Sequence, residues 1–153
     1  MNPGIFREYD IRGVAGKDIL EEDAVIIGKA YGSLLNKQNK KIVSVGRDCR
    51  KTSDRFSDLF IQGILSTGCD VVDIGVCPTP VLYFSIQHLN LDGGAMVTAS
   101  HNPPEYNGFK LMSGEDSIHS RGLQDIRMIA EKKEFARGNG TKTRKDVITP
   151  YKD

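Results

Sequence analysis

Short runs of β-branched and small apolar residues alternate with segments of helical periodicity, and this alternation is the feature that most constrains the fold. Three runs have the length and composition of buried strands, at 42–45, 70–75 and 93–98. Around them, apolar residues recur at the i, i+3, i+4 spacing of amphipathic helices. Strands that alternate with helices predict βαβ units. We therefore expect a three-layer α/β/α domain with a mixed, mostly parallel sheet.

The expected helix boundaries rest on capping signals. Asp18 and Glu21 have the spacing of a capping box and predict the start of the first helix. Thr79 is a suitable N-cap for a later helix, because Pro80 then occupies the first helical position. A final helix is expected over 122–135. Residues 109–112 read as a hairpin partner of the strand at 93–98.

Length, charge and cysteine content exclude several protein classes. A chain of 153 residues has the size of one globular domain, and its net charge of +1 disfavours a nucleic-acid partner, which usually requires a basic excess. The longest apolar run near the start, 24–27, is too short for a signal peptide or a membrane span. Three cysteines without C-x-x-C spacing favour reduced thiols over a disulfide framework or a zinc site. We expect a cytoplasmic protein with no membrane partner.

Three polar loops follow the expected strands or open the chain, at 7–13, 46–51 and 98–108. In α/β sheets, ligands gather at the carboxyl ends of the strands, so we expect these loops to converge. They would place the hydroxyl of Ser100 and the imidazole of His101 among several arginine and lysine side chains. Guanidinium groups bind phosphate oxygens in a bidentate manner. The residues therefore predict an anion site.

Ser100 has two plausible roles at such a site. It can act as a nucleophile with His101 as the proton acceptor, or it can hold a phosphoryl group of about −1.5 to −2 charge that nearby cations stabilise. Simpler interpretations remain open on the residues alone. A Ser-His pair is common in turns, the basic run at 47–51 can be a solvated cluster, and Asp10 can simply pair with Arg12.

Three segments, in order along the chain, resemble motifs of the α-D-phosphohexomutase family. Residues 98–103, Thr-Ala-Ser-His-Asn-Pro, resemble the active-serine signature, and 107–110 continue it. Residues 6–13 resemble the opening of the branch with bacterial phosphomannomutase/phosphoglucomutase, whereas the glucosamine-phosphate mutase branch usually opens with a Gly-Thr-Asp-Gly type of run. Gly46-Arg47-Asp48, followed by Arg50 and Ser53, resembles a third segment. The resemblance covers essentially the whole chain and implies the domain I fold of that family.

The resemblance implies a phosphoryl-transfer reaction. Ser100 would carry a phosphoryl group, give it to a mannose or glucose monophosphate to form a 1,6-bisphosphate, and take back the phosphoryl group from the other position. The net result would interconvert hexose 6-phosphate and hexose 1-phosphate. Tyr9 and Arg12 would bind substrate, with Arg12 near the phosphoserine. His101 and Lys110 are the candidates for proton transfer and charge neutralisation, and which does which stays open.

Loop support and metal binding are also implied by the resemblance. Arg47 and Asn102 would support the serine loop. Mg²⁺ would bind an oxygen of the phosphate on Ser100, and its other ligands would come from an Asp-x-Asp-x-Asp-Arg loop of a second domain. No such run occurs among these 153 residues, and Mg²⁺ needs further oxygen ligands.

The expected organisation is therefore an amino-terminal domain at 1–136 and a linker at 137–153 toward a second domain that this sequence lacks. The linker begins with a stretch rich in glycine and positive charge. The partners would be hexose phosphate and the remaining domains of the same enzyme, and we expect the chain alone to be inactive. The alternatives are a glucosamine-phosphate mutase and a non-catalytic sugar-phosphate-binding or regulatory module.

Overall fold

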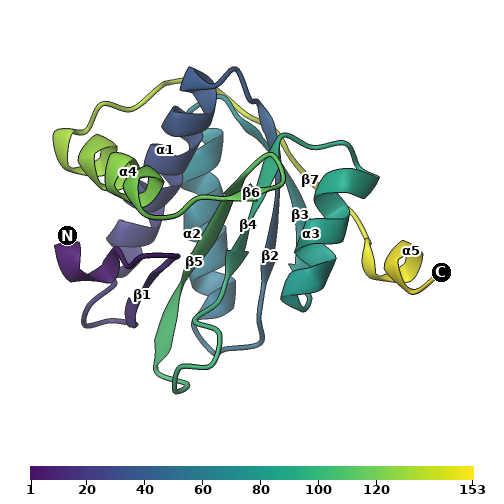
Figure 1. Ribbon diagram of the computed structural model, residues 1–153, viewed down its shortest axis with the longest axis horizontal. Helices are drawn as coiled ribbons and strands as arrows, with labels where there is room; N and C mark the ends of the chain where they lie inside the picture. Colours follow the sequence, from purple (N-terminus) through teal and green to yellow (C-terminus); the bar gives the residue numbers. More distant parts are fainter.

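The computed structural model describes all 153 residues (Figure 1). It contains five α-helices, seven strands and one short 3-10 helix. In chain order, they are η1 (Pro3–Ile5), β1 (Ile11–Val14), α1 (Glu21–Lys37), β2 (Ile42–Arg47), α2 (Ser53–Leu65), β3 (Asp70–Val76), α3 (Thr79–His88), β4 (Gly93–Val97), β5 (Tyr106–Ser113), β6 (Asp116–Ser117), α4 (Arg121–Lys132), β7 (Lys142–Arg144) and α5 (Ile148–Lys152).

All seven strands belong to one mixed sheet. Its order is β1-β5-β4-β2-β3-β7, with β6 paired to β5 outside this path. Strands β4, β2, β3 and β7 run parallel to one another, whereas β5 runs antiparallel to both β4 and β1. The three strands expected from the β-branched runs form the centre of the sheet as β2, β3 and β4. The predicted fold class, a mixed and mostly parallel sheet in a three-layer α/β/α domain, is confirmed.

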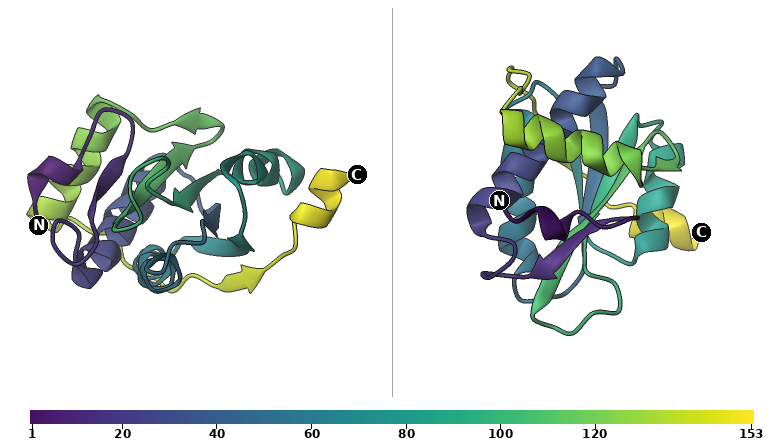
Figure 2. Two further views of the ribbon diagram at one scale, coloured as in Figure 1. Left: turned by 90° about the horizontal axis from the view of Figure 1, so that it is seen from below. Right: turned by 60° about the vertical axis from the view of Figure 1, so that its left-hand side comes forward.

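Helices cover both faces of this sheet (Figure 2). Helices α1 and α2 pack together on one face with α4 beside α1, and α3 covers the other face next to α5. Neighbouring residues of β3 accordingly enter different cores. Val71 belongs to the larger apolar cluster with α1 and α2, and Val72 belongs to the smaller cluster with α3. Such alternation follows from the two-residue period of a strand that is buried on both sides.

Helices α1 and α2 approach each other closely at two glycines. A Cβ atom on Gly28 would lie 2.2 Å from the backbone oxygen of Phe60, and one on Gly63 would lie 2.2 Å from the oxygen of Val25. Real Cβ atoms do not approach backbone atoms this closely, so the helix pair requires glycine at both positions. This contact fixes α2, and therefore the loop that precedes it, against the rest of the domain.

Two capping predictions are wrong. Helix α1 begins at Glu21 with Leu20 as its N-cap, and the carboxylate that accepts from the N–H of Leu20 (2.8 Å) belongs to Asp23. Asp18 instead accepts from the N–H of Val14 at 2.9 Å, in the turn before the helix. Helix α3 is shifted by one residue, because Pro78 is its N-cap and Thr79 its first residue.

The segment expected as a linker, 137–153, contains two regular elements. Strand β7 pairs in parallel with β3 at the edge of the sheet, and α5 follows it and packs near α3. The domain boundary after residue 136 stays a prediction. No helix of the structure is long and apolar enough to cross a membrane.

Candidate functional site

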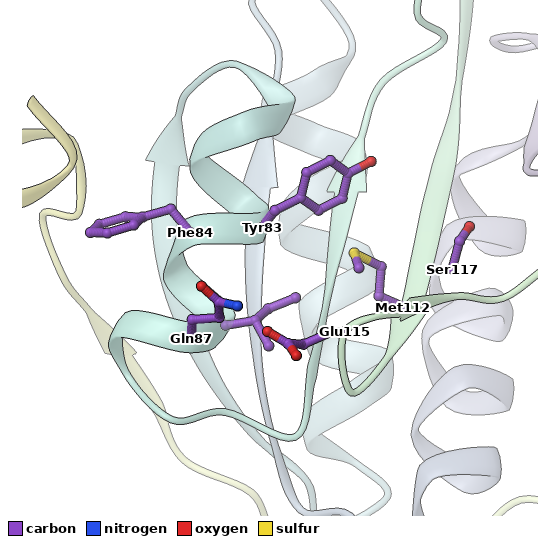
Figure 3. Close-up of a pocket in the computed structure, with 7 residues that line it drawn as sticks. Tyr83, Phe84, Gln87, Met112, Glu115 and Ser117 are labelled. Atoms are coloured by element: carbon purple, nitrogen blue, oxygen red, sulfur yellow. The ribbon is translucent and has the colours of Figure 1, made fainter.

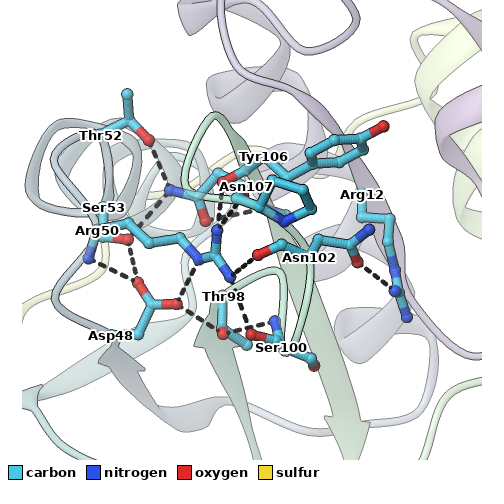
Figure 4. A network of polar contacts seen from close by, with 12 residues as sticks. Arg12, Asp48, Arg50, Thr52, Ser53, Thr98, Ser100, Asn102, Tyr106 and Asn107 are labelled. Carbon is cyan, nitrogen blue, oxygen red and sulfur yellow. Dashed lines mark hydrogen bonds and ion pairs between the residues drawn. The ribbon is translucent and has the colours of Figure 1, made fainter.

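The carboxyl ends of β2 and β4 bring two of the predicted polar loops together. These strands are parallel neighbours, with Arg47 opposite Val97, so the loops that follow them leave the same edge of the sheet. The loop after β4, residues 98–105, is called the serine loop here. It returns into β5, which pairs with β1 and places Arg12 opposite Gly108. Residues from all three predicted loops therefore meet around Ser100 (Figure 4).

Arg50 joins the β2 loop to the serine loop. Its guanidinium donates to four backbone carbonyl groups and to the carboxylate of Asp48, whose Oδ2 lies 3.0 Å from Nε (Figure 4). The four carbonyl partners are Pro103 (2.6 Å) and Tyr106 (3.1 Å) on Nη1, and Ser100 and Asn102 (both 2.9 Å) on Nη2. One side chain thus contacts the serine loop near its beginning, its middle and its end.

The carboxylate of Asp48 accepts hydrogen bonds from both the β2 loop and the serine loop. Its carboxylate accepts from the hydroxyls of Ser53 (2.5 Å) and Thr98 (2.7 Å) as well as from the side chain and N–H of Arg50. Partial burial alone would raise the pKa of Asp48, but the hydrogen bonds from Ser53, Thr98 and Arg50 outweigh it and lower the pKa below the ordinary value of 3.8. The group therefore remains a carboxylate that balances the charge of Arg50.

Ser100 itself has an unusual backbone. Its φ is +55°, in the left-handed region that side chains other than glycine rarely adopt. Its N–H donates to the hydroxyl of Thr98 (3.0 Å) and its carbonyl accepts from Arg50, but its own hydroxyl makes no hydrogen bond within the chain. The backbone N–H groups of Ala99 and His101 on either side of it also have no partner. Ser100 therefore has an unbonded hydroxyl, and the residues on both sides of it have unbonded backbone donors.

A buried carboxylate holds two of the predicted cationic residues. Asp10 is 1% exposed and accepts from Nε and Nη2 of Arg12, the shortest contact being 2.7 Å. Nζ of Lys110 lies 3.8 Å from the same carboxylate. The remaining nitrogen of Arg12 donates to the side-chain oxygen of Asn102 in the serine loop. Asp10 thus holds both cations, and Arg12 joins this pair to the serine loop through Asn102.

The other predicted site residues lie further out. His101 is exposed and makes no hydrogen bond. Tyr9 is 64% exposed, and its ring lies 5.9 Å, centroid to centroid, from the ring of His119. The hydroxyl of Ser120 donates to Glu8 beside this pair, which ties the opening loop to the start of α4.

Arg47 makes no side-chain hydrogen bond or ion pair with the serine loop. Its guanidinium pairs with Asp54 (2.6 Å) and Asp73 (3.5 Å), because the side chain at the end of β2 is directed toward α2 and β3. Arg50, three residues later, makes the loop contacts instead. In the sequence, Arg50 and Arg47 belong to one basic run, and no separate role was predicted for Arg50, Asp48 or Asp10. The Gly-Arg-Asp-x-Arg segment is the signal that could have identified the first two.

The donor set for a metal ion is small. No group of three or more His, Cys, Asp or Glu side chains in the chain is placed to hold one. The carboxylates of Asp48 and Asp10, which contact residues of the serine loop or their partners, are engaged by hydroxyl and cationic donors. The residues present could therefore offer Mg²⁺ one ligand, a phosphate oxygen on Ser100, and Mg²⁺ requires further oxygen ligands.

A separate groove of about 620 Å³ lies between α3 and the β5–β6 hairpin (Figure 3). Its lining combines apolar and polar side chains, including Tyr83, Phe84, Met112 and Glu115. None of the residues around Ser100 lines it. The groove is therefore separate from the site around Ser100.

Comparisons with known proteins agree with this geometry. Residues 3–137 match the family model described as phosphoglucomutase/phosphomannomutase, alpha/beta/alpha domain I. The chain is 41% identical to a phosphoglucomutase/phosphomannomutase of Thermococcus kodakarensis and covers 34% of that protein with 96% of its own length. It is also 41% identical to a phosphomannomutase/phosphoglucomutase of Pseudomonas aeruginosa, with 96% of this chain and 32% of that protein covered.

A solved structure shows the same fold. The crystal structure of a phosphoglucomutase/phosphomannomutase family protein from Burkholderia thailandensis superposes with a TM-score of 0.94 at 36% identity, over 99% of this chain and 35% of that one. The chain thus spans about a third of the length of the relatives that it matches. On sequence, family motif and fold together, the chain belongs to the phosphoglucomutase/phosphomannomutase family and carries its alpha/beta/alpha domain I.

Proposed function

We propose that this chain is the phosphoserine domain of an enzyme that interconverts the 6-phosphate and 1-phosphate of mannose or glucose, with Ser100 as the phosphoryl carrier. The observation that carries the proposal is the environment of Ser100. Its hydroxyl is unbonded, the backbone N–H groups of the two flanking residues are unpaired, and the loop that holds it contacts Arg12 through Asn102. Family membership supports the same reaction.

The chemistry begins with Ser100 phosphorylated. A free hydroxyl of the hexose monophosphate attacks phosphorus, a new P–O bond forms, and the bond from phosphorus to Oγ of Ser100 breaks. The sugar hydroxyl gives up its proton to a base, for which His101 and Lys110 are the candidates. The resulting 1,6-bisphosphate turns round, and Oγ of Ser100 takes back the phosphoryl group from the other carbon. Each transfer needs mainly positioning and charge stabilisation.

The cations of the site supply part of that stabilisation. Arg12 balances the charge of the transferring group from a position fixed by the buried Asp10, and Lys110, held by the same carboxylate, adds to this if His101 is the base. Backbone N–H groups at Ala99 and His101 add two neutral donors. Mg²⁺, bound through a phosphate oxygen on Ser100 and ligands outside this chain, would supply further positive charge. We place Tyr9 at the sugar-binding side, where its exposure leaves it free for substrate.

We infer that the 153-residue chain does not turn over hexose phosphate by itself. The relatives are about three times as long, and the ligands for Mg²⁺ and the contacts to the sugar are expected from other domains of the same enzyme. The three free cysteines support a cytoplasmic location. Partners are therefore hexose phosphate and those further domains.

The experiment compares mutase turnover of the full-length protein that carries this chain with that of its Ser100→Ala variant. Glucose 1-phosphate and mannose 1-phosphate serve as substrates, and formation of the 6-phosphate is measured. We expect turnover to be lost in Ser100→Ala and kept in Ser117→Ala, which removes an exposed hydroxyl of β6 remote from the serine loop. Normal turnover by Ser100→Ala would refute the carrier role. Binding of hexose phosphate without turnover in the wild type would favour the non-catalytic module.

A further inference from the structure

We propose that Arg50 is a positioning residue for Ser100, a role that rests on the proposed function. It acts by fixing the serine loop in the conformation that presents the Ser100 hydroxyl. This proposal rests on the hydrogen bonds of its guanidinium, which occupy every N–H donor of the group. Its nitrogens make five hydrogen bonds, four to loop carbonyl groups and one to Asp48. A guanidinium has five N–H donors, so none remains for a substrate or a phosphoryl group.

Few backbone hydrogen bonds form within the serine loop. Most of its other contacts with the domain lie at its two ends, where Thr98 bonds to Gly108 and Asp48 and the carbonyl of Glu105 accepts from the N–H of Ala15. Pro103 and Pro104 have no N–H to donate, and only two hydrogen bonds join backbone groups within 98–106, from Asn102 to Ala99 and from Tyr106 to Pro103. The left-handed φ of Ser100 adds an unfavourable conformation that surrounding contacts must maintain. Four charge-assisted bonds from one planar group provide that constraint.

The orientation of the Ser100 carbonyl group connects the contact with Arg50 to phosphoryl transfer. The carbonyl of Ser100 turns toward Arg50, while the N–H groups of Ala99 and His101 are left without acceptors in the chain. Backbone donors without a partner, in the residues that flank Ser100, are available to a phosphoryl dianion on its hydroxyl. Arg50 thus stabilises the loop geometry in which these donors remain available.

Asn102 connects Arg50 to a second cation, Arg12. Its backbone carbonyl accepts from Arg50, and its side-chain oxygen accepts from Arg12. Asp48 holds Arg50 in turn, and the Arg50 side chain is only 12% exposed. Displacement of Arg50 would therefore shift the Ser100 backbone and the partner of Arg12 together.

The test uses the full-length protein that carries this chain, with Arg50→Met and Arg50→Lys. Arg55→Met is the matched control, because Arg55 is exposed and pairs only with Glu21. The first readout is amide hydrogen exchange in the unphosphorylated protein. We expect exchange of the hydrogen-bonded amides in the segment 98–107, those of Thr98, Ser100, Asn102 and Tyr106, to rise by about 10-fold or more in both Arg50 variants, with β3 and α1 unchanged. Unchanged exchange in 98–107 would overturn the inference, whatever the activity.

The second readout is the single-turnover phosphorylation of Ser100 by glucose 1,6-bisphosphate. We expect the rate at saturation to fall by about 100-fold with little change in the half-saturating concentration, because a small displacement of the nucleophile affects the reaction more than binding. Lysine keeps the charge but not the planar fork, so Arg50→Lys should resemble Arg50→Met. Full activity in Arg50→Lys would show that only charge matters and would contradict positioning.

The two readouts separate the inference from the proposed function. If wild-type Ser100 accepts no phosphoryl group, the carrier role fails, while the exchange data still decide whether Arg50 holds the loop. If Arg50→Met does not fold, Arg50→Lys gives both readouts, since it keeps a cation beside Asp48.

Discussion

Replacing Asp10 by asparagine should destabilise the domain through the two cations that this carboxylate holds. Asparagine keeps the shape of the side chain but removes the negative charge. In the wild type, the buried carboxylate accepts three hydrogen bonds from Arg12, at 2.7, 2.9 and 3.2 Å, and lies 3.8 Å from Lys110. The variant would leave Arg12 with a weaker neutral acceptor and Lys110 with none.

The expected loss in the free energy of unfolding depends on how exposed the three charged side chains are. Breaking a fully buried ion pair by removal of one partner costs about 3–5 kcal/mol. Here the carboxylate is 1% exposed, but the side chains of Arg12 and Lys110 are 28% and 31% exposed and remain partly hydrated. The asparagine oxygen also preserves part of the contact to Arg12. We therefore expect a loss of about 2–3 kcal/mol in the free energy of unfolding.

Urea denaturation of the 153-residue chain, followed by circular dichroism, measures this loss. A corresponding decrease of about 5–10 °C is expected in the melting temperature. Asp58→Asn is the matched control, because Asp58 is an exposed residue of α2 with no ion pair or side-chain hydrogen bond. The reasoning is refuted if Asp10→Asn unfolds within about 0.5 kcal/mol of the wild type, the range of ordinary surface substitutions.

Three further predictions follow from other parts of the structure. Gly28→Ala should lower the free energy of unfolding by about 1–3 kcal/mol, because its Cβ would overlap the oxygen of Phe60 at the helix contact; an unchanged urea midpoint would contradict that close approach. The lowered pKa of Asp48 contributes stability above the unfolded value of 3.8 that is lost as pH falls through the folded pKa. The stability difference between wild type and Asp48→Asn should therefore shrink below pH 3.8, and a constant difference would argue against it. Burial raises the pKa of Cys77 to about 11, so at neutral pH iodoacetamide should modify the exposed Cys49 and spare Cys77 in the native chain, as peptide mapping can verify.

The central sheet could be predicted from the sequence because its strands are buried on both faces. Short runs of β-branched and small apolar residues identify β2, β3 and β4 without reference to the rest of the fold. Strand β7 gave no such signal, since its three residues, Lys142–Arg144, are polar and exposed and are held by backbone pairing to β3. The predicted start of α1 was wrong because Asp18 and Asp23 each accept from a backbone N–H group near the helix start. The sequence does not show which of the two carboxylates caps the helix, since this depends on the path of the backbone.

The candidate site was located by its motifs but not by its internal contacts. The serine loop and Arg12 could be selected from the sequence, and the structure brings them together through Asn102. The role of Arg50 could not, because its acceptors are backbone carbonyl groups about fifty residues away, which have no sequence signature. Asp10 was considered only as a partner of Arg12, and its second cation, Lys110, becomes its neighbour through the pairing of β1 with β5.

Phosphopeptide mapping of Ser100 tests the account most directly. The full-length protein that carries this chain is incubated with glucose 1,6-bisphosphate, digested and analysed by mass spectrometry. We expect one phosphoryl group on the peptide that contains Ser100, and its transfer to added glucose 1-phosphate. Phosphate on another residue, or none on Ser100 while the enzyme turns over hexose phosphate, would contradict the assignment of Ser100 as the carrier.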